Sequence, residues 1–477
     1  MTNKEFRAYA HELVDWMADY LQDIEKYPVR SGASPGDILG RLPLHPPSSG
    51  EPFPEIFADF RNTIVPGMTH WQHPSFFAYF PANNSPPSIL AEMLTATMGA
   101  QCMSWATSPA ATELEERMMQ WLGEMTGLPP SFTGVIQDTA STSTLCAMLT
   151  ARERRSAFRI NAEGLSRSAR YAVYISTETH SSIERAVKIA GLGSAALRRL
   201  PVDEHFAMIP EALEEAIARD AAAGFEPLCA VATIGTTGST AIDPLKRIGD
   251  ICARHGVWLH VDAAYGGTAM LLPELRWMIE GIELADSFVF NPHKWMFTNF
   301  DCSAYFVRDA GLLVRTFEIL PEYLRTPEGE RVRNYRDWGI QLGRRFRALK
   351  LWFVIRTFGV DGLRALVRGH IALAQSFARA IGGEPDFEVL APVPFAAVCF
   401  RYHPPGMDDP AALDRANSAL MEELNRTGRM FITHTRLNGR IALRFVASQT
   451  GVTQRHVDEA LQRIRTTARS HAWADPA

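Results

Sequence analysis

The chain has 477 residues, of which 46% are hydrophobic and 21% charged. It is long enough for one large domain with a core plus smaller ones, and its composition excludes a disordered or collagen-like protein. The net charge of −5 is dispersed and gives no field that would concentrate polyanions, so we expect no nucleic-acid partner. The six cysteines lack zinc-site spacing and disulfide-scaffold density, which predicts no metal and buried thiols in a reducing compartment.

The N-terminal segment predicts an amphipathic helix. Apolar residues fall at helical spacing over residues 6–24, and the helix is expected to end before Pro28. The segment is charged throughout, so we expect neither a signal peptide nor a membrane span, and a cytoplasmic location. A proline-rich stretch over residues 32–54 then predicts an extended arm. An arm after a helix with an exposed apolar stripe suggests exchange between the subunits of a dimer.

The middle of the chain alternates short apolar runs with longer helical segments, which indicates βαβ units around a mainly parallel sheet. Each run is too short for a separate helix and is rich in β-branched or aromatic residues. Ligands of open α/β sheets bind beyond the carboxyl ends of the strands, so the residues after each run are candidates for chemistry. The four runs are residues 171–176, 228–234, 257–261 and 287–290.

The pattern changes after Gly359 to that of a small α+β domain. It predicts a helix over residues 360–381, short strands around 395–402 and 440–446, and a closing helix from Val452. We therefore expect an N-terminal helical dimerisation arm (1–85), a large ligand-binding domain (86–360) and a small C-terminal domain (361–477).

Residues after the four runs match the needs of pyridoxal phosphate. This cofactor requires a primary amine, an anion beside its pyridine nitrogen, and hydroxyls, backbone amides and helix N-termini around its phosphate. Lys294 supplies the amine. Asp262 ends a run expected to be buried, where a cationic ring nitrogen would offset the cost of an unpaired carboxylate. Ala264 leaves space for a flat ring, and His180 could cover the other face.

Longer motifs carry a resemblance to a known family. Asn291-Pro-His-Lys-Trp295 and His260-Val-Asp-Ala-Ala-Tyr265 resemble the group II pyridoxal-phosphate decarboxylases of fold type I, closest to the aromatic-L-amino-acid (DOPA/tryptophan) decarboxylases. The resemblance implies an α/β fold with a mainly parallel seven-stranded sheet in the large domain, an N-terminal helical arm and a small α+β C-terminal domain. It also implies a homodimer with swapped N-terminal helices. Further matching motifs are residues 70–74, 77–81, 134–141, 179–182 and 342–350.

The resemblance also implies residue roles. Lys294 would hold pyridoxal 5'-phosphate as a Schiff base, Asp262 would pair with the pyridine nitrogen, and His180 would stack on the ring. Ala140, Ser141, Asn291 and His293 would hold the phosphate, and Thr237 would orient the ring. The substrate pocket would be formed by Trp71, Tyr79, Phe80, Pro81, Ala82, Met103, His180 and Gly343.

Residues 318–338 are polar and charged and predict a lid over the site. By resemblance, Tyr323 occupies the place of the lid tyrosine that protonates Cα of the product, so it counts with Lys294, His180 and Asp262 as catalytic. Relatives with phenylalanine at this place react with oxygen and yield an aldehyde. Tyr323 therefore favours formation of the amine and CO2 from an aromatic L-amino acid of the DOPA, tryptophan, tyrosine or phenylalanine type.

Two departures from the family pattern affect the substrate pocket. Ala82 stands where relatives have threonine, and the stretch expected from the neighbouring subunit reads Gln101-Cys102-Met103 rather than aliphatic and aromatic. Gly343 resembles family members that admit larger indole rings. These differences leave open which aromatic amino acid is preferred.

Several alternatives remain open from the sequence. They are a decarboxylation-dependent aldehyde synthase, a decarboxylase of a non-aromatic acid such as glutamate, and a non-catalytic scaffold. The scaffold is disfavoured because Lys294, Asp262 and Tyr323 are all present. Residues 191–196 imitate a dinucleotide-binding fingerprint, but they follow a helical segment, which predicts helix capping instead. Two sets of these residues could also have ordinary structural roles. Helix caps are the alternative for Thr237, Ala140 and Ser141. Core packing is the alternative for the aromatic residues Trp71, Tyr79 and Phe80.

Overall fold

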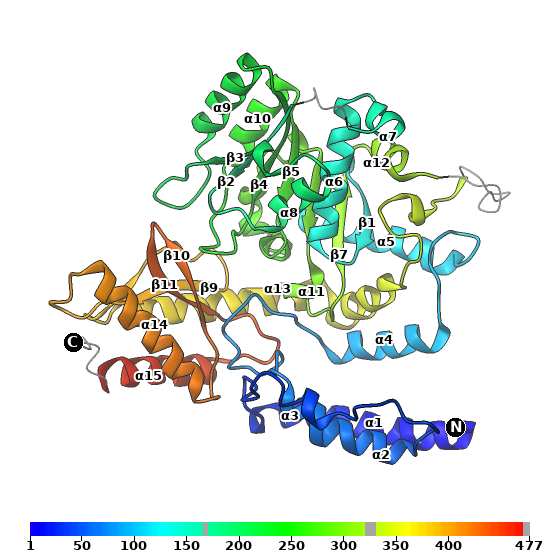
Figure 1. Cartoon of the computed structure of the whole chain (residues 1–477), viewed down its shortest axis with the longest axis vertical. Coiled ribbons are helices and arrows are strands. Elements are labelled where there is room, and N and C mark those ends of the chain that lie inside the picture. The colour runs from blue at the N-terminus through cyan, green and yellow to red at the C-terminus, as the bar shows by residue number, and fades with distance from the viewer. Residues whose placement is uncertain (166–169, 320–330, 471–477) are drawn as a thin grey trace. The chain divides into compact units, whose positions relative to one another are not determined.

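The computed structural model describes residues 1–165, 170–319 and 331–470 (Figure 1). They divide into two compact units. One comprises Phe80–Ala374 and Ala391–Val398, and the other comprises Met1–Tyr79, Gln375–Leu390 and the chain from Cys399 onward. The three-part division at residues 85 and 360 stays a prediction.

The unit that begins at Phe80 is built on a seven-stranded sheet in the order β1-β7-β6-β5-β4-β2-β3. Strand β7 is antiparallel to both of its neighbours, and the pairs from β6 to β3 are all parallel. The predicted mainly parallel sheet is therefore confirmed. The strands are β1 (Thr133–Gln137), β2 (Tyr171–Ser176), β3 (Leu197–Leu200), β4 (Glu226–Thr233), β5 (Trp258–Asp262), β6 (Ser287–Phe290) and β7 (Ser303–Val307).

The central strands are continuous apolar runs because both of their faces are covered. All six residues of β2 are buried, as are all five of β5. Helices α6 and α8 pack on one another, and their apolar side chains join those of β2, β4 and β5 in one core cluster. The helices of this unit are α4 (Pro86–Met98), α5 (Pro109–Thr126), α6 (Ala140–Arg155), α7 (Arg159–Glu163), α8 (Ser182–Ile189), α9 (Pro210–Ala222), α10 (Leu245–His255), α11 (Pro292–Trp295) and α12 (Ala310–Phe317).

The glycine pair after α8 caps that helix. Gly191 has a positive φ of 77°, and the N–H of Leu192 donates to the carbonyl of Val187, which is how a left-handed residue ends a helix. The prediction of helix capping rather than a dinucleotide loop is confirmed. Short helical turns elsewhere are η1 (Ile24–Lys26), η2 (Leu39–Arg41), η3 (Phe60–Ile64), η4 (Ser194–Ala196), η5 (Gly266–Leu271), η6 (Pro273–Ile279), η7 (Ile282–Leu284) and η10 (Tyr335–Asp337).

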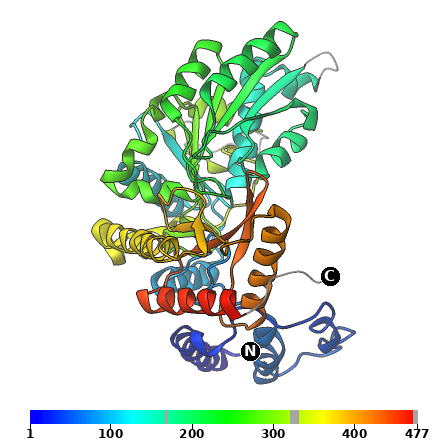
Figure 2. The same ribbon diagram turned by 90° about the vertical axis from the view of Figure 1, so that its left-hand side faces the viewer.

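The other unit contains a four-stranded sheet in the order β10-β11-β9-β8. Figure 2 shows its last two helices, α14 in orange and α15 in red, beside each other. Its elements are α1 (Asn3–Gln22), α2 (Phe53–Asp59), α3 (Val65–Gly67), β8 (Phe387–Val389), β9 (Ala397–Tyr402), α14 (Pro410–Arg426), β10 (Thr433–Leu437), β11 (Arg440–Val446) and α15 (Gln454–Ser470).

Helix α13 (Arg347–Gly382) differs from the prediction of a helix over residues 360–381. It begins earlier and is interrupted at Gly359, whose φ of 66° and ψ of 168° are not helical. The predicted helix is therefore its second segment. All six cysteines are buried free thiols, as expected. Among the described helices, none combines the length and apolar character that crossing a membrane requires.

Candidate active site

A cavity of about 260 Å³ lies beyond the carboxyl ends of β4, β5 and β6. Thr233 ends β4, Asp262 ends β5, and Asn291 directly follows β6. Since these neighbouring strands are parallel, their final residues meet at one edge of the sheet. The cavity is lined by Phe80, Thr139, Ala140, Ser141, His180, Ser182, Thr233, Gly235, Thr237, Asp262, Ala264, Tyr265, Asn291, His293, Lys294 and Phe300.

Lys294 lies on the short helix α11, which begins at Pro292 and is separated from β6 by Asn291 alone. Its backbone N–H donates to the carbonyl of Asn291 at 2.9 Å, so a tight turn fixes the lysine at the strand end. The amine Nζ lies 5.3 Å from the centroid of the Phe80 ring. That ring stacks on Tyr265, with centroids 3.8 Å apart. The amine of Lys294 therefore faces a pair of stacked aromatic rings.

Asp262 is buried at the end of β5. Its Oδ1 accepts a hydrogen bond of 3.0 Å from the N–H of Ala264, which holds the carboxylate against the turn that follows the strand. A carboxylate placed in such a site favours a cationic partner, because burying an uncompensated charge is costly.

His180 follows β2, and its orientation is set by Ser182. The backbone N–H of Ser182 donates to His180 Nδ1 at 3.2 Å, and the Ser182 hydroxyl lies 2.7 Å from the same atom. Nδ1 is therefore the acceptor, and the neutral ring carries its proton on Nε2. Burial lowers the pKa of His180; the negative charge of Asp262 opposes the change and the positive charge of Lys294 adds to it.

The N-terminus of α6 opens on the cavity. Thr139 caps the helix, with Oγ1 accepting from the N–H of Thr142, and Ala140 and Ser141 form the first turn. The unpaired N–H groups and the dipole of a sixteen-residue helix make its first turn an anion-binding position. His293 adds a neutral imidazole: burial, with the charges of Lys294 and Lys350, lowers its pKa to about 3.

Two buried polar atoms in the lining make no hydrogen bond within the described chain. They are Oδ1 of Asn291 and Oγ1 of Thr233. Buried polar groups are normally satisfied, so these atoms indicate a polar occupant. With an amine, a carboxylate and a helix N-terminus around the same space, the donor set fits a flat, phosphorylated, cationic ring.

The structure brings together all nine residues predicted to contact the cofactor, which are Ala140, Ser141, His180, Thr237, Asp262, Ala264, Asn291, His293 and Lys294. Of the predicted substrate residues, Phe80 and His180 line the same cavity. Trp71 and Tyr79 belong to the other unit. Pro81, Ala82, Met103 and Gly343 do not line this cavity in the described chain. Tyr323 lies outside the described residues. The roles of all these residues stay predictions.

The predicted specificity stretch is tied to the loop that carries Gly343. The N–H of Cys102 donates to the carbonyl of Arg344, and the N–H of Arg344 donates to the Gln101 side chain, both at 2.9 Å. The N–H of Arg336 donates to the carbonyl of Met103. Residues 101–103 are thus held in place by hydrogen bonds to the backbone of Arg336 and Arg344.

Six lining residues were not predicted as site residues: Thr139, Ser182, Thr233, Gly235, Tyr265 and Phe300. Most stand within or beside motifs that the sequence singled out, so position next to a strand end could have identified them. Phe300 carries no such signal, because it lies in an irregular segment between α11 and β7.

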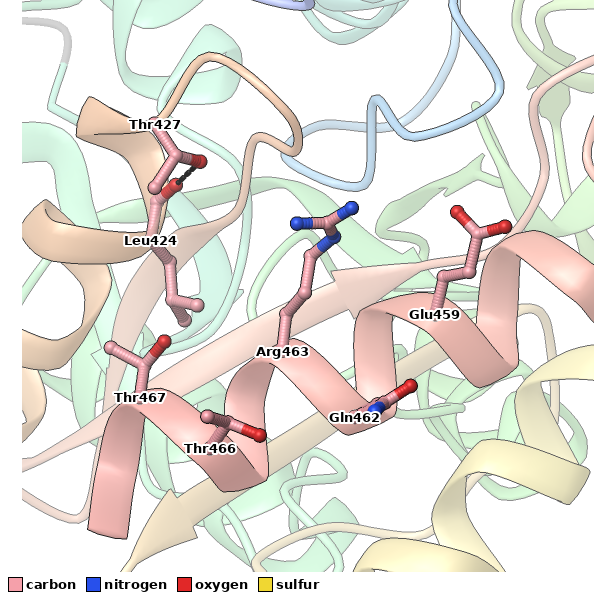
Figure 3. Close-up of a pocket in the computed structure, with 7 residues that line it drawn as sticks. All are labelled: Leu424, Thr427, Glu459, Gln462, Arg463, Thr466 and Thr467. Carbon is pink, nitrogen blue, oxygen red and sulfur yellow. Dashed lines mark hydrogen bonds between the residues drawn. The ribbon is translucent and has the colours of Figure 1, made fainter. Parts of the chain in front are cut away.

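A groove in the other unit is less suited to catalysis. It has a volume of about 370 Å³ and lies between α14 and α15 (Figure 3). Glu459 and Arg463 extend from α15, and the Thr427 hydroxyl donates to the carbonyl of Leu424. Glu459 is already paired with Arg455 at 3.0 Å. The lining contains no nucleophile beside a base.

Comparisons with known proteins point in the same direction as the geometry. Residues 35–403 match the family model described as the pyridoxal-dependent decarboxylase conserved domain. The chain is 41% identical to phenylacetaldehyde synthase of Arabidopsis thaliana, over 98% of this chain and 96% of the relative. It is also 41% identical to a tryptophan decarboxylase of Camptotheca acuminata, over 98% and 94%.

A solved structure of Oryza sativa TDC with PLP and tryptamine is similar over nearly the whole chain. The TM-score is 0.95 and the identity 37%, over 98% of this chain and 99% of the other. The similarity confirms the predicted fold class, a fold type I arrangement with a small antiparallel C-terminal sheet.

Proposed function

The chain belongs to the pyridoxal-dependent decarboxylase family, and from this we propose that it removes the α-carboxylate of an aromatic L-amino acid to give CO2 and the amine. It is a carboxy-lyase of the aromatic-L-amino-acid decarboxylase group, and its cofactor is pyridoxal 5'-phosphate.

One observation carries the proposal: the amine of Lys294, the carboxylate of Asp262 and the imidazole of His180 line one cavity beyond the carboxyl ends of β6, β5 and β2. Lys294 would hold the cofactor covalently, Asp262 would keep its pyridine nitrogen protonated, and His180 would cover the face of its ring. The bound cofactor supplies a cationic ring that accepts the electrons of the bond to the departing carboxylate. The charge of Asp262 therefore has the largest leverage on the barrier.

The phosphate would be held by neutral donors and a helix terminus. Ala140 and Ser141 offer backbone N–H groups at the start of α6, and Asn291 and His293 offer side chains. Thr237, from the turn after β4, would orient the ring. These contacts would keep the cofactor in place independently of its bond to Lys294.

A proton must reach Cα after CO2 leaves, and we assign its delivery to the phenol of Tyr323. Retention of this tyrosine favours the amine as product. The similarity to phenylacetaldehyde synthase supports the second candidate, a decarboxylation-dependent aldehyde synthase, at the same level of identity. The two reactions share the loss of CO2 and differ only in what happens at Cα.

The aromatic side chains near Lys294 support an aromatic substrate. Phe80 presents a ring beside Lys294, and Trp71 and Tyr79 would add to the pocket.

Exposed apolar side chains support a second copy of the chain. Phe6 of α1 is 59% exposed, and Met98 of α4 is 57% exposed. We propose a homodimer with swapped N-terminal helices, in which Met103 and Gly343 reach the partner's pocket. Six buried thiols are compatible with a cytoplasmic location.

The test is product analysis with purified holoenzyme. Tryptophan, DOPA, tyrosine, phenylalanine and glutamate are supplied separately, and CO2, amine, aldehyde and peroxide are measured. The proposal expects one mole of amine per mole of CO2 from at least one aromatic amino acid and none from glutamate. Stoichiometric aldehyde and peroxide would establish the aldehyde synthase instead, and CO2 from glutamate alone would overturn the aromatic assignment.

A further inference from the structure

A larger cavity, of about 930 Å³, lies in the same unit as the cofactor site and shares no lining residue with it. Its volume is within the range of small-molecule sites. The lining is mainly apolar and includes Met208, Ile242, Pro394 and Trp277. The Trp277 side chain is 62% exposed, and its ring stacks on no aromatic ring among the described residues. The proposed reaction does not use this cavity.

The turn after β4 separates the two cavities. Ala241 lines the larger one, and its carbonyl accepts hydrogen bonds from the N–H groups of Gly235 (2.9 Å) and Thr236 (3.1 Å). The N–H of Ala241 donates to Oγ1 of Thr236 at 3.0 Å. Gly235 and Thr237 line the cofactor site. A displacement of Ala241 would therefore move the residues around the cofactor.

Asp243 makes a second connection between the cavities. Its buried carboxylate accepts from the N–H of Met208 through Oδ1 and from the N–H of Thr233 through Oδ2, both at 2.7 Å. Met208 lines the larger cavity, and Thr233 lines the cofactor site. The carboxylate of Asp243 thus connects the lining of the larger cavity to the lining of the cofactor site.

Phe395 makes a third connection. It follows Pro394 of the larger cavity and packs edge-on against Tyr265 and Trp295, at centroid distances of 6.2 and 6.3 Å. Tyr265 lines the cofactor site, and Trp295 is the neighbour of Lys294 in the chain. Close packing of this kind transmits a shift instead of absorbing it.

The backbone around the larger cavity is strained in two places. Thr240, which lines it, has a φ of 60°, and Phe206, between two lining residues, has a φ of 65°. Residues with side chains rarely adopt this conformation, and it is most costly for a β-branched residue such as threonine. Strain held by its surroundings is common at ligand sites, so these outliers support a binding role.

The charges at the rim favour a cation. Asp203 and Glu211 bring two carboxylates, and Arg247 brings one fixed cation that already pairs with Glu211. Among the described residues Asp203 has no ion-pair partner, although its Oδ1 accepts hydrogen bonds from the N–H groups of His205 (2.8 Å) and Ala207 (2.9 Å). The exposed face of Trp277 also attracts an ammonium group. We propose that this cavity binds a small aromatic amine and that the bound amine alters the cofactor site through the Ala241 turn, Asp243 and Phe395.

Binding can be tested independently of the reaction. The holoenzyme is first treated with borohydride, which fixes the cofactor to its lysine so that an added amine cannot replace that bond. It is then titrated by calorimetry with phenethylamine, 2-phenylethanol and phenylacetate. We expect saturable binding of the amine, about tenfold weaker binding of the neutral alcohol and the weakest binding of the anion. No saturable binding of the amine, or equal affinity for all three, would overturn the proposal.

Variants locate the site. Trp277→Ala should weaken phenethylamine binding about tenfold, and Trp277→Phe should restore most of it, because a ring is kept. Ile189→Ala is the control, since Ile189 is also 62% exposed but lies on α8 outside the cavity. We expect Ile189→Ala to bind phenethylamine with the affinity of the wild type. Unchanged binding in Trp277→Ala, or equal losses in both alanine variants, contradicts the assignment.

The regulatory part rests on the proposed function, because an aromatic amine is also its product. With saturating substrate, phenethylamine should change kcat of the wild type and leave kcat of Trp277→Ala unaffected. An equal effect on both would place the amine in the active site and overturn the coupling. The calorimetric result stands even if no aromatic amino acid is decarboxylated, so the two proposals can fail separately.

Discussion

The backbone N–H of Cys302 donates a hydrogen bond of 2.9 Å to Nδ1 of His293. The N–H of His293 donates in return to the carbonyl of Cys302 at 3.2 Å. Because Nδ1 is an acceptor, the ring carries its proton on Nε2. Burial, with two nearby lysines, lowers the pKa of His293 to about 3, so the ring is neutral at physiological pH. It can serve an anion as a hydrogen-bond donor but not as a cation.

Replacing His293 with leucine should raise the dissociation constant of pyridoxal 5'-phosphate about tenfold, because one hydrogen bond to a charged group is lost. A lowered pKa means that the neutral form persists as pH falls, so the ratio of variant to wild-type affinity should stay constant between about pH 5 and pH 8. Fluorescence titration of cofactor-free protein measures both. His403→Leu, at a half-exposed histidine outside the cofactor cavity, is the control. A ratio that changes with a midpoint near the ordinary histidine pKa would show a charged ring.

Asp262→Asn should lower kcat about 100-fold and leave KM nearly unchanged, because the amide keeps the shape but not the charge that stabilises the cationic ring. Release of CO2 from the best aromatic substrate is the measurement, with the absorption spectrum confirming that the cofactor is bound. Asp250→Asn, at a half-exposed aspartate on α10, serves as control. Full activity in Asp262→Asn would remove this carboxylate from its assigned role.

Tyr323→Phe should shift the product from amine toward aldehyde while CO2 release continues, because the variant has no phenol to protonate Cα and oxygen reacts there instead. Amine, aldehyde and peroxide are quantified from one reaction. Tyr335→Phe is a matched control for loss of a phenol, since that tyrosine lies outside the cofactor cavity. An unchanged yield of amine from Tyr323→Phe would show that another group delivers the proton.

The strands that carry the site could be read from the sequence because each is a short run buried on both faces. Residues 171–176 and 287–290 were predicted with their observed bounds, and β4 and β5 differ by one or two residues at their ends. Strands β1 and β7 were not predicted as elements. They pair with each other across about 170 residues of chain, and their pairing depends on that distant partner.

The residues of the site could be predicted because their positions follow from those of the strands. Asp262 ends β5 and Lys294 lies on the short helix that follows β6, and the parallel pairing of these two strands brings both residues to one edge of the sheet. Phe300 could not be predicted, because its place in the cavity depends on the irregular path of the chain before β7. The early start of α13 was missed because the break at Gly359 divides its periodicity.

A buried ion pair supports the stretch that we expect to set substrate preference. Arg344 Nη2 donates to Glu115 Oε1 and to the carbonyl of Ile136, both at 2.7 Å, and neither side chain of the pair is exposed to solvent beyond 4%. The backbone of Arg344 holds Gln101 and Cys102. The pair therefore links α5, β1 and the specificity stretch.

Arg344→Met should destabilise the protein by about 3–5 kcal/mol, because it leaves the carboxylate of Glu115 buried without a partner. The double variant Arg344→Met/Glu115→Leu should recover part of the loss. Urea unfolding of the three proteins measures this. Arg345→Met, at the half-exposed neighbouring arginine, is the control. A double variant less stable than Arg344→Met alone would contradict an uncompensated charge as the cause.

The most direct measurement is borohydride reduction of the holoenzyme followed by proteolysis and mass spectrometry of the modified peptide. The mass of the reduced pyridoxal phosphate should be found on Lys294, in the peptide that contains Asn291 and His293, and Lys294→Ala should yield no labelled peptide. Label on any other lysine, or retention of the cofactor's absorption band by Lys294→Ala, would contradict the assignment of the site.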